Sequence, residues 1–309
     1  MRTGYAISFT ARDGVELSGR LLMPDAPKAL ILICSATGLR QQFYWKFAEW
    51  MTTQGYGVLT FDYRGIGASL NGRSVRDSSA RKQDWGQLDM PAALDYLVCK
   101  FPDLPIHLVG HSAGGQLIGL MPNHDRLERI VTVGASSGYL YNLSLRVRLV
   151  AAFLLKVYIP LTAKLLGYAP TRWIGWGEDL PAQVALQWAA WCTRPGYVLN
   201  ALGSDVPLDF FDQIKGPILW LTATDDPIAT PENIDDMLRL YENASVTRRR
   251  IDPREYGLKR IAHVDFFRAR NAKLWPLIAD WLSPKSLNES KFGAIKDTLR
   301  LNESRPIKC

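Results

Sequence analysis

The fold of this chain is decided by the stretch Ile106-His107-Leu108-Val109-Gly110-His111-Ser112-Ala113-Gly114-Gly115-Gln116-Leu117. An apolar, strand-like run ends there in Gly-x-Ser-x-Gly and leads directly into an apolar helical pattern. This pattern predicts a sharp strand-to-helix turn with Ser112 at its tip. Gly110 and Gly114 suit such a turn, because the serine backbone is strained and neighbouring chains pass too close for side chains. The first N–H groups of the following helix favour negative charge beside Ser112. We therefore take Ser112 as the candidate nucleophile.

The same five-residue pattern occurs a second time, around Ser136. With 24 glycines in the chain, an accidental match is not rare, so the residues that follow each serine must decide. Ser112 is followed by the start of an apolar helix. Ser136 is followed by Gly138-Tyr139-Leu140-Tyr141-Asn142, which is typical of a loop that leaves a strand. We therefore prefer Ser112 and interpret Ser136 as part of a small-residue turn near the same face.

The composition is that of an ordinary soluble globular protein. The 309 residues are 47% hydrophobic and 22% charged, and the length suffices for one large α/β domain. Residues 1–10 lack the apolar core of a secretory signal. The four cysteines lack the spacing of a zinc site or a disulfide framework; they are Cys34, Cys99, Cys192 and Cys309. We expect a cytoplasmic protein without a metal ion or other cofactor.

The net charge of +7 comes partly from basic clusters at Arg248-Arg249-Arg250 and Lys259-Arg260. No nucleic-acid-binding motif accompanies these clusters, so we expect a solvated basic surface and no nucleic-acid partner. The positive net charge is compatible with peripheral contact with an anionic membrane surface. Nothing in the sequence predicts an oligomeric state.

Strand and helix patterns alternate along most of the chain. A β-hairpin is predicted at residues 5–9 and 15–23, with Asp13-Gly14 in its turn. Further strands are predicted at residues 29–33, 57–61, 130–133, 217–223, 245–251 and before Ser112, and helices at 43–53, 84–98, 231–241 and 266–282. This alternation predicts an α/β fold with a doubly wound, mostly parallel sheet. The loops after the carboxyl ends of the strands then share one functional edge.

The alternation stops at residues 138–206, which form too long a connection between two elements of such a sheet. Four tryptophans and two helical patterns, at residues 145–166 and 181–192, occur in this segment. We interpret it as a helical cap inserted into a core formed by residues 1–137 and 207–283, with a polar C-terminal tail at 284–309. Lys156, Pro160 and Lys164 interrupt the apolar run in the first helix, so we expect no stable insertion into a membrane.

A nucleophilic serine needs a base and a group that orients the base, which follow it along the chain in the order acid, then histidine. His263, just before the last predicted helix, fits the base; His124 comes too early and His107 belongs to a central strand. Two adjacent carboxylates, Asp225 and Asp226, follow the strand at 217–223. Successive residues point in different directions, so one of them is expected to reach His263. We choose Asp226, and expect Asp225 to brace the loop.

An oxyanion formed at Ser112 requires two main-chain N–H donors. Ala113, directly after the nucleophile, supplies the first. The second is expected from the loop after the strand at 29–33, where we choose Ala36 over Thr37.

The chain resembles the α/β-hydrolase superfamily from about residue 5 to residue 282. More narrowly, it is similar to a group of bacterial hydrolases related to serine aminopeptidase-like and monoglyceride lipase-like domains. The resemblance implies an α/β-hydrolase fold and a triad of Ser112, Asp226 and His263. At Ala262 and Asp265 this chain departs from the glycines expected around the histidine. The matching segments are Ser35-Ala36-Thr37-Gly38, Phe61-Asp62-Tyr63-Arg64-Gly65-Ile66-Gly67, Asp84-Trp85-Gly86-Gln87-Leu88-Asp89, Gly110-His111-Ser112-Ala113-Gly114-Gly115-Gln116, Gly177-Glu178-Asp179-Leu180-Pro181, Thr224-Asp225-Asp226-Pro227-Ile228 and His263-Val264-Asp265-Phe266-Phe267-Arg268.

These residues predict a serine hydrolase that forms an acyl-enzyme on Ser112. The apolar cap favours a carboxylesterase or lipase-like enzyme whose partner is a small apolar ester or thioester. An acyltransferase would use the same triad and differ only in the attacking acceptor. A non-catalytic ligand-binding module with the same fold is the alternative outside the enzymes.

Overall fold

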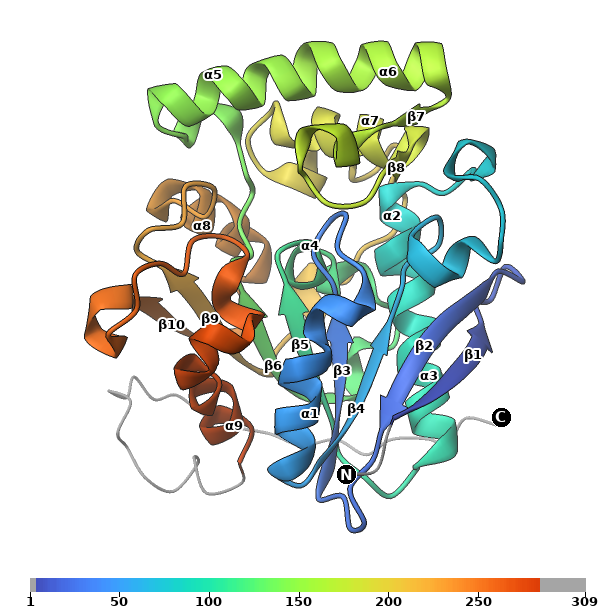
Figure 1. Cartoon of the computed structure of the whole chain (residues 1–309), viewed down its shortest axis with the longest axis vertical. Coiled ribbons are helices and arrows are strands. Elements are labelled where there is room, and N and C mark those ends of the chain that lie inside the picture. The colour runs from blue at the N-terminus through green and yellow to red at the C-terminus, as the bar shows by residue number, and fades with distance from the viewer. Residues whose placement is uncertain (1–3, 284–309) are drawn as a thin grey trace.

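An eight-stranded sheet forms the centre of the molecule in the computed structural model, which describes residues 4–283 (Figure 1). The strand order is β1-β2-β4-β3-β5-β6-β9-β10. β2 runs antiparallel to both of its neighbours, β1 and β4, and all other pairs are parallel. The strands are β1 Tyr5–Thr10, β2 Glu16–Leu22, β3 Ala29–Cys34, β4 Tyr56–Phe61, β5 Ile106–His111, β6 Leu127–Val133, β9 Pro217–Ala223 and β10 Ser245–Ile251. The predicted doubly wound, mostly parallel sheet is confirmed.

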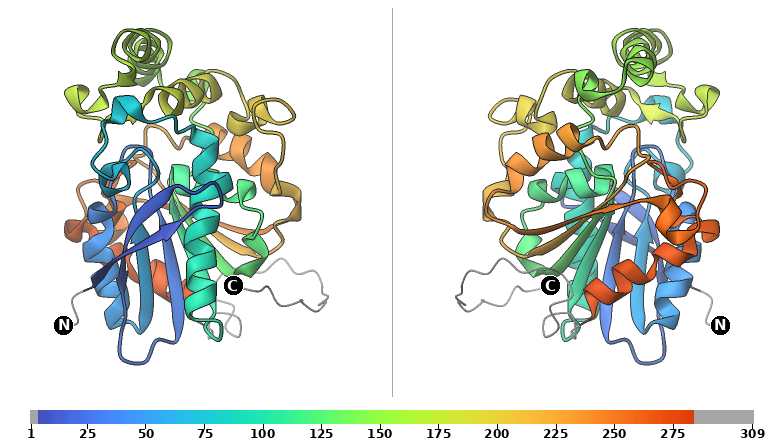
Figure 2. Two further views of the ribbon diagram at one scale, coloured as in Figure 1. Left: turned by 90° about the vertical axis from the view of Figure 1, so that its right-hand side faces the viewer. Right: turned by 90° about the vertical axis from the view of Figure 1, so that its left-hand side faces the viewer.

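Helices cover both faces of this sheet (Figure 2). α1 (Trp45–Thr53) and α9 (Pro276–Leu282) pack into one apolar cluster, and α3 (Met90–Lys100) and α8 (Pro231–Leu238) pack into the other. Successive residues of a strand alternate between the two clusters, as Leu30 and Ile31 do in β3. Every residue of β3, β4 and β5 is buried. This burial is expected of parallel strands covered by helices on both sides.

Two of the predicted helices differ in the structure. The helix predicted at residues 266–282 is broken into 3₁₀ turns at Asp265–Phe267 and Ala269–Leu274 and the short α9. Arg268 separates the two 3₁₀ turns with an extended backbone (φ −72°, ψ 142°). Pro276 is the first residue of α9, a position where its missing N–H costs no hydrogen bond within the helix. The helix predicted at 84–98 begins with α2 (Lys82–Asp84) and a π-helical turn at Trp85–Asp89 before α3.

Residues 138–206, called the cap segment below, lie above the carboxyl ends of the strands (Figures 1 and 2). They contain α5 (Leu145–Phe153), a π-helical turn (Leu154–Tyr158), α6 (Ile159–Leu166), a small β7–β8 ladder (Tyr168–Ala169 with Leu180–Pro181) and α7 (Ala182–Cys192). Its inner residues belong to the larger of the two clusters that also fill the core, so apolar side chains of the cap segment are in contact with those of the sheet and its helices. The polar tail predicted at 284–309 lies outside the described residues.

Candidate active site

The turn between β5 and α4 (Ala113–Gln116) carries Ser112. Ser112 has φ 47° and ψ −106°, a strained backbone that sharp turns at active sites often hold. A Cβ on Gly114 would lie 2.1 Å from the carbonyl oxygen of Cys34, and a Cβ on Gly110 would lie 2.6 Å from the main chain of Gly114. The structure therefore confirms that neither glycine leaves room for a side chain.

Ser112, His263 and Asp226 form a continuous line of hydrogen-bonding groups. His263 Nε2 lies 3.0 Å from Ser112 Oγ, and His263 Nδ1 lies 2.8 Å from Asp226 Oδ2. The side chain of His263 is 14% exposed and that of Asp226 is 1% exposed. Three residues that are far apart in the sequence thus meet at the carboxyl edge of the sheet, each in a loop that follows or precedes a strand or helix.

The two adjacent aspartates have separate partners. Asp226 Oδ1 accepts hydrogen bonds from the N–H groups of Ile228 (2.8 Å) and Ala229 (3.0 Å), which leaves Oδ2 directed at His263. Asp225 instead accepts from the N–H groups of Ile261 (3.0 Å) and Ala262 (2.9 Å). Asp225 therefore holds the loop that presents His263, while Asp226 contacts the imidazole itself.

The charges of this pair shift both of its pKa values. Burial lowers the pKa of His263, but the charge of Asp226 and its hydrogen bond outweigh burial, and the net shift is upward. Burial likewise raises the pKa of Asp226, and His263 together with the two N–H donors brings it below its ordinary value. Asp226 is thus ionised at neutral pH and stabilises a proton on His263, which is what a general base requires.

The loop around His263 explains the two departures from glycine. Ala262 has φ +45°, a left-handed conformation that glycine adopts without strain and alanine does not. Its N–H bond to Asp225 helps to hold this conformation. Asp265 is buried and pairs with Arg268 (2.8 Å) and Arg270 (2.5 Å), so its carboxylate is neutralised by arginines of its own segment.

The structure argues against Ala36 as the second oxyanion donor. Its N–H donates to Tyr44 Oη at 2.9 Å, so it is not free to bind an oxyanion. The alternative donor, Thr37 N–H, has no acceptor in the part of the chain that the structure describes. Gly114 N–H donates to the carbonyl of Ser35 (3.1 Å), which holds this loop against the start of α4. Ala113 is the first residue of α4, and its N–H has no acceptor within the helix.

A buried imidazole that the sequence analysis missed connects the two loops of the site. His111 Nε2 lies 2.9 Å from the carbonyl oxygen of His263, and His111 Nδ1 lies 2.8 Å from Tyr44 Oη. A carbonyl can only accept, so we assign the proton of His111 to Nε2, and Tyr44 then donates to Nδ1. Burial lowers the pKa of His111 to about 3, in agreement with a neutral ring. The chain of bonds runs from the N–H of Ala36 through Tyr44 and His111 to the His263 loop.

Lys82 is a second residue that the sequence analysis missed. It is fully buried, and its main-chain N–H donates to Gln187 of α7 (2.8 Å). Its Nζ donates to Thr37 Oγ1 (2.7 Å) and lies 4.8 Å from the ring centre of Trp85. Burial lowers the pKa of Lys82 to about 7. A lysine with one side-chain acceptor thus lies beside the candidate oxyanion loop, and nothing in its sequence neighbourhood distinguishes it from an exposed lysine.

The remaining sequence candidates take no part in the hydrogen bonds between Ser112, His263 and Asp226. Ser136 is fully buried in the turn after β6, and its Oγ has no hydrogen-bond partner among the described residues. His107 is buried in β5, where burial lowers its pKa to about 4. His124 follows α4 in a 3₁₀ turn and packs on Phe210. No group of three or more potential metal ligands occurs within residues 4–283.

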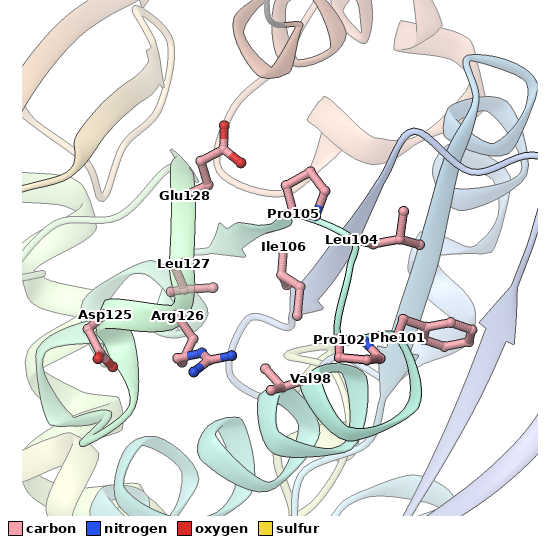
Figure 3. Close-up of a pocket in the computed structure, with 10 residues that line it drawn as sticks. All are labelled: Val98, Phe101, Pro102, Leu104, Pro105, Ile106, Asp125, Arg126, Leu127 and Glu128. Atoms are coloured by element: carbon pink, nitrogen blue, oxygen red, sulfur yellow. The ribbon is translucent and has the colours of Figure 1, made fainter. Parts of the chain in front are cut away.

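A surface cavity of about 290 Å³ lies at the opposite edge of the sheet, where α3 ends and β5 and β6 begin (Figure 3). Its wall includes Asp125, Arg126 and Glu128 together with prolines and aliphatic residues. β5 separates this cavity from Ser112 by its whole length, roughly 20 Å at about 3.3 Å per residue. The cavity contains none of the predicted site residues, and we assign the candidate site to the carboxyl edge.

Comparison with known proteins agrees with this fold. The sequence matches the model of the Alpha/beta hydrolase family over residues 31–270, and no curated protein matches it significantly. A highly thermostable carboxyl esterase from Bacillus coagulans has a similar structure, with a TM-score of 0.62 and 13% identity over 91% of this chain and 98% of that one. An esterase from Pyrococcus furiosus has a TM-score of 0.61 and 16% identity, over 91% of this chain and 90% of that one. The esterase domain of a Rhodothermus marinus protein has a TM-score of 0.53 and 18% identity, over 90% of this chain and 97% of that one. At such identities the solved structures establish a common fold, and the family match is decisive: this chain belongs to the alpha/beta hydrolase family.

Proposed function

We propose that this protein is a serine hydrolase that cleaves a carboxylic ester through an acyl-enzyme on Ser112. The observation that carries the proposal is the line from Ser112 Oγ to His263 Nε2 (3.0 Å) and from His263 Nδ1 to Asp226 Oδ2 (2.8 Å). These distances are those of a nucleophile, its base and the group that orients the base. The strained backbone of Ser112 (φ 47°) supports the same role.

In the first half of the reaction, Ser112 Oγ attacks the carbonyl carbon while His263 Nε2 takes its proton. The carbonyl oxygen becomes negative and is bound by the N–H groups of Ala113 and Thr37, each of which is typically worth about 10²–10³ in rate. The tetrahedral intermediate then expels the alcohol, which receives the proton from His263. An acyl group remains bound to Ser112 Oγ.

In the second half, a water molecule gives a proton to His263 and attacks the acyl carbon. The second tetrahedral intermediate breaks its bond to Ser112 Oγ, which regains the proton from His263, and the carboxylic acid leaves. Asp226 stays ionised throughout and stabilises the imidazolium that forms twice.

The cap segment supports an apolar acyl group as the substrate class. It covers the carboxyl edge of the sheet with α7 (Figure 1), and Trp188 of this helix packs against Trp176 of the preceding loop with ring centres 6.0 Å apart. Pockets that bind small apolar ligands are mostly lined by aromatic and aliphatic side chains.

A fluorophosphonate probe tests the nucleophile, because it reacts with activated serines. We expect peptide mass spectrometry to find the adduct on the peptide that contains Ser112, and Ser112→Ala to abolish labelling. Ser136→Ala is the matched control, since that serine lies in the second Gly-x-Ser-x-Gly pattern, and it should be labelled normally. Labelling that survives in Ser112→Ala, or an unlabelled wild type that also fails to hydrolyse p-nitrophenyl esters of any chain length, would overturn the proposal.

A further inference from the structure

The outer helix of the cap segment exposes an unusual amount of apolar surface. α5, the π-helical turn and α6 follow one another without interruption as the helix Leu145–Leu166, which crosses the top of the molecule (Figures 1 and 2). Among the described residues it is the one helix whose length and composition would suffice to cross a membrane, and 28% of its most apolar window is buried. Its apolar face consists of seven side chains that are 47–67% exposed: Leu145, Leu149, Val150, Phe153, Val157, Leu161 and Leu165.

Six of these residues recur at every fourth position, from Leu145 to Leu165. In a regular α-helix of 3.6 residues per turn, such a series would drift by about 40° at each step. The π-helical turn at Leu154–Tyr158 winds more slowly than an α-helix, because its hydrogen bonds span five residues. The turn offsets part of this drift and keeps the apolar side chains on the outer side.

The inner side of the same helix is fixed to the molecule. Leu154, Leu155 and Ile159 are buried and belong to the cluster that also contains Val184 and Ala185 of α7. Withdrawing the helix to span a bilayer would expose this cluster to water. The helix is therefore built to lie on an apolar surface rather than to cross it.

The charge of the cap segment is of one sign near this face. No aspartate or glutamate occurs between Glu128 and Glu178. The exposed basic side chains of the helix are Arg146, Lys156 and Lys164, none of which forms an ion pair among the described residues. Next to the helix, Trp173 is 70% exposed and Ile174 is 41% exposed. Exposed apolar side chains flanked by lysine, arginine and tryptophan are typical of helices that lie in the interface of a membrane.

We propose that the apolar face of Leu145–Leu166 docks the protein peripherally on a bilayer that contains anionic phospholipids. The seven apolar side chains enter the acyl boundary, and the basic side chains bind the headgroups. A second copy of this chain fits less well, because two such faces would bring their unpaired basic residues together without any acid between them.

Docking would place the candidate site close to the lipid, a consequence that rests on the function proposed above. Glu178, which follows the exposed tryptophans, donates its N–H to the carbonyl of Gly38 (2.7 Å) and pairs with Arg40. Gly38 follows Thr37 in the candidate oxyanion loop. The loop that follows the exposed Trp173 and Ile174 is thus bonded to the loop that would bind the reacting carbonyl.

Vesicle flotation tests the docking directly. The full chain is mixed with vesicles of phosphatidylcholine, with or without phosphatidylglycerol, and the vesicle-bound fraction is measured at low and high salt. We expect binding to the mixed vesicles that salt weakens, because ions screen the basic residues. Ser112→Ala should bind like the wild type, so the result does not depend on whether the protein is a hydrolase.

Two variants identify the face. Leu149→Ser/Phe153→Ser/Leu161→Ser is expected to weaken binding at least tenfold, since each removes an exposed apolar side chain. Its control is Tyr5→Ser/Leu199→Ser/Leu208→Ser, three side chains that are also exposed (52%, 39% and 67%) but lie outside the face. Circular dichroism and thermal melting verify that both variants fold.

The charges are tested in the same way. Each basic residue near an anionic surface contributes about fivefold to the binding affinity. The double variant Lys156→Glu/Lys164→Glu should therefore bind the mixed vesicles more weakly by at least this factor for each of the two substitutions. Lys100→Glu/Lys215→Glu, at two exposed lysines elsewhere, is the control with the same change of net charge.

Three outcomes overturn the proposal. The first is no binding to the mixed vesicles by the folded wild type. The second is equal binding by the face variants and their controls. The third is a concentration-dependent dimer that buries the face, seen by analytical ultracentrifugation and lost in the serine variant, with no binding to vesicles.

Discussion

Lys82→Met isolates the energetic consequence of burying one ammonium group beside the candidate oxyanion loop. Burial lowers the pKa of Lys82 from 10.5 to about 7. A difference of about 3.5 in pKa, at about 1.4 kcal/mol for each unit, corresponds to about 5 kcal/mol. This is the order of the penalty that the folded protein carries below pH 7, where the side chain is protonated in both the folded and the unfolded state. Methionine keeps the apolar stem and removes the charge.

The sign of the pH dependence follows from proton binding. Between pH 7 and pH 10.5 the unfolded chain holds more protons on this lysine than the folded protein does, so the wild-type free energy of unfolding rises with pH. We expect Lys82→Met to have a higher free energy of unfolding than the wild type at pH 7. The lost hydrogen bond to Thr37 reduces this gain by about 1 kcal/mol. The advantage should shrink by about 2 kcal/mol between pH 7 and pH 9.

Urea unfolding of both proteins at a series of pH values measures this difference. Other groups titrate over the same range, but they cancel between wild type and variant. Lys100→Met, at an exposed lysine, is the control and should differ from the wild type by an amount that does not change with pH. A constant difference between Lys82→Met and the wild type from pH 6 to pH 10 would refute the reasoning.

Further predictions concern the candidate active site. Because its surroundings raise the pKa of His263, hydrolysis should fall as pH drops, with a kcat/KM midpoint above about 6.5. Asp226→Asn removes the group that raises this pKa; kcat should fall on the order of 10⁴, and the acid midpoint of the pH profile should move to lower pH. Tyr44→Phe leaves His111 Nδ1 and one main-chain N–H without their buried partner, and urea unfolding should show a loss of about 2–4 kcal/mol. Ser136→Ala removes an Oγ without a partner and should retain full activity in an ester assay and at least equal stability; a large loss of activity would reopen the choice between the two serines.

Strand bounds and the turn around Ser112 could be predicted from short stretches of the sequence. The strand at Pro217–Ala223 and the strand at Ser245–Ile251 agree with their predicted bounds, because β-branched and aromatic residues such as Ile218, Trp220 and Val246 favour strands and turn residues flank both segments. The close approach of Gly110 and Gly114 to their neighbours could also be predicted, since Gly-x-Ser-x-Gly between a strand and a helix allows the backbone of the turn few other conformations. The small β7–β8 ladder was missed, because two residues on each side carry no periodicity.

The candidate site was predicted from the sequence in part. The sequence order predicted that Ser112, Asp226 and His263 would share one edge of the sheet, and the structure brings them together. The sequence could not show that the N–H of Ala36 is bonded to the hydroxyl of Tyr44, because the position of that hydroxyl is set by tertiary packing. The same holds for Lys82, whose neighbours Thr37 and Gln187 are far from it in the sequence.

The neutral state of His111 has a consequence for the shape of the pH profile. Two imidazoles lie with ring centres 6.0 Å apart, and if both took up protons near neutrality, each would repel the other's charge and acid inactivation would extend over several pH units. With the pKa of His111 held at about 3, His263 is the one of these two imidazoles that changes its charge near neutral pH. For the proposed hydrolysis, we therefore expect the pair of imidazoles to take up a single proton near neutral pH, which gives the acid limb of the pH profile a Hill slope of one.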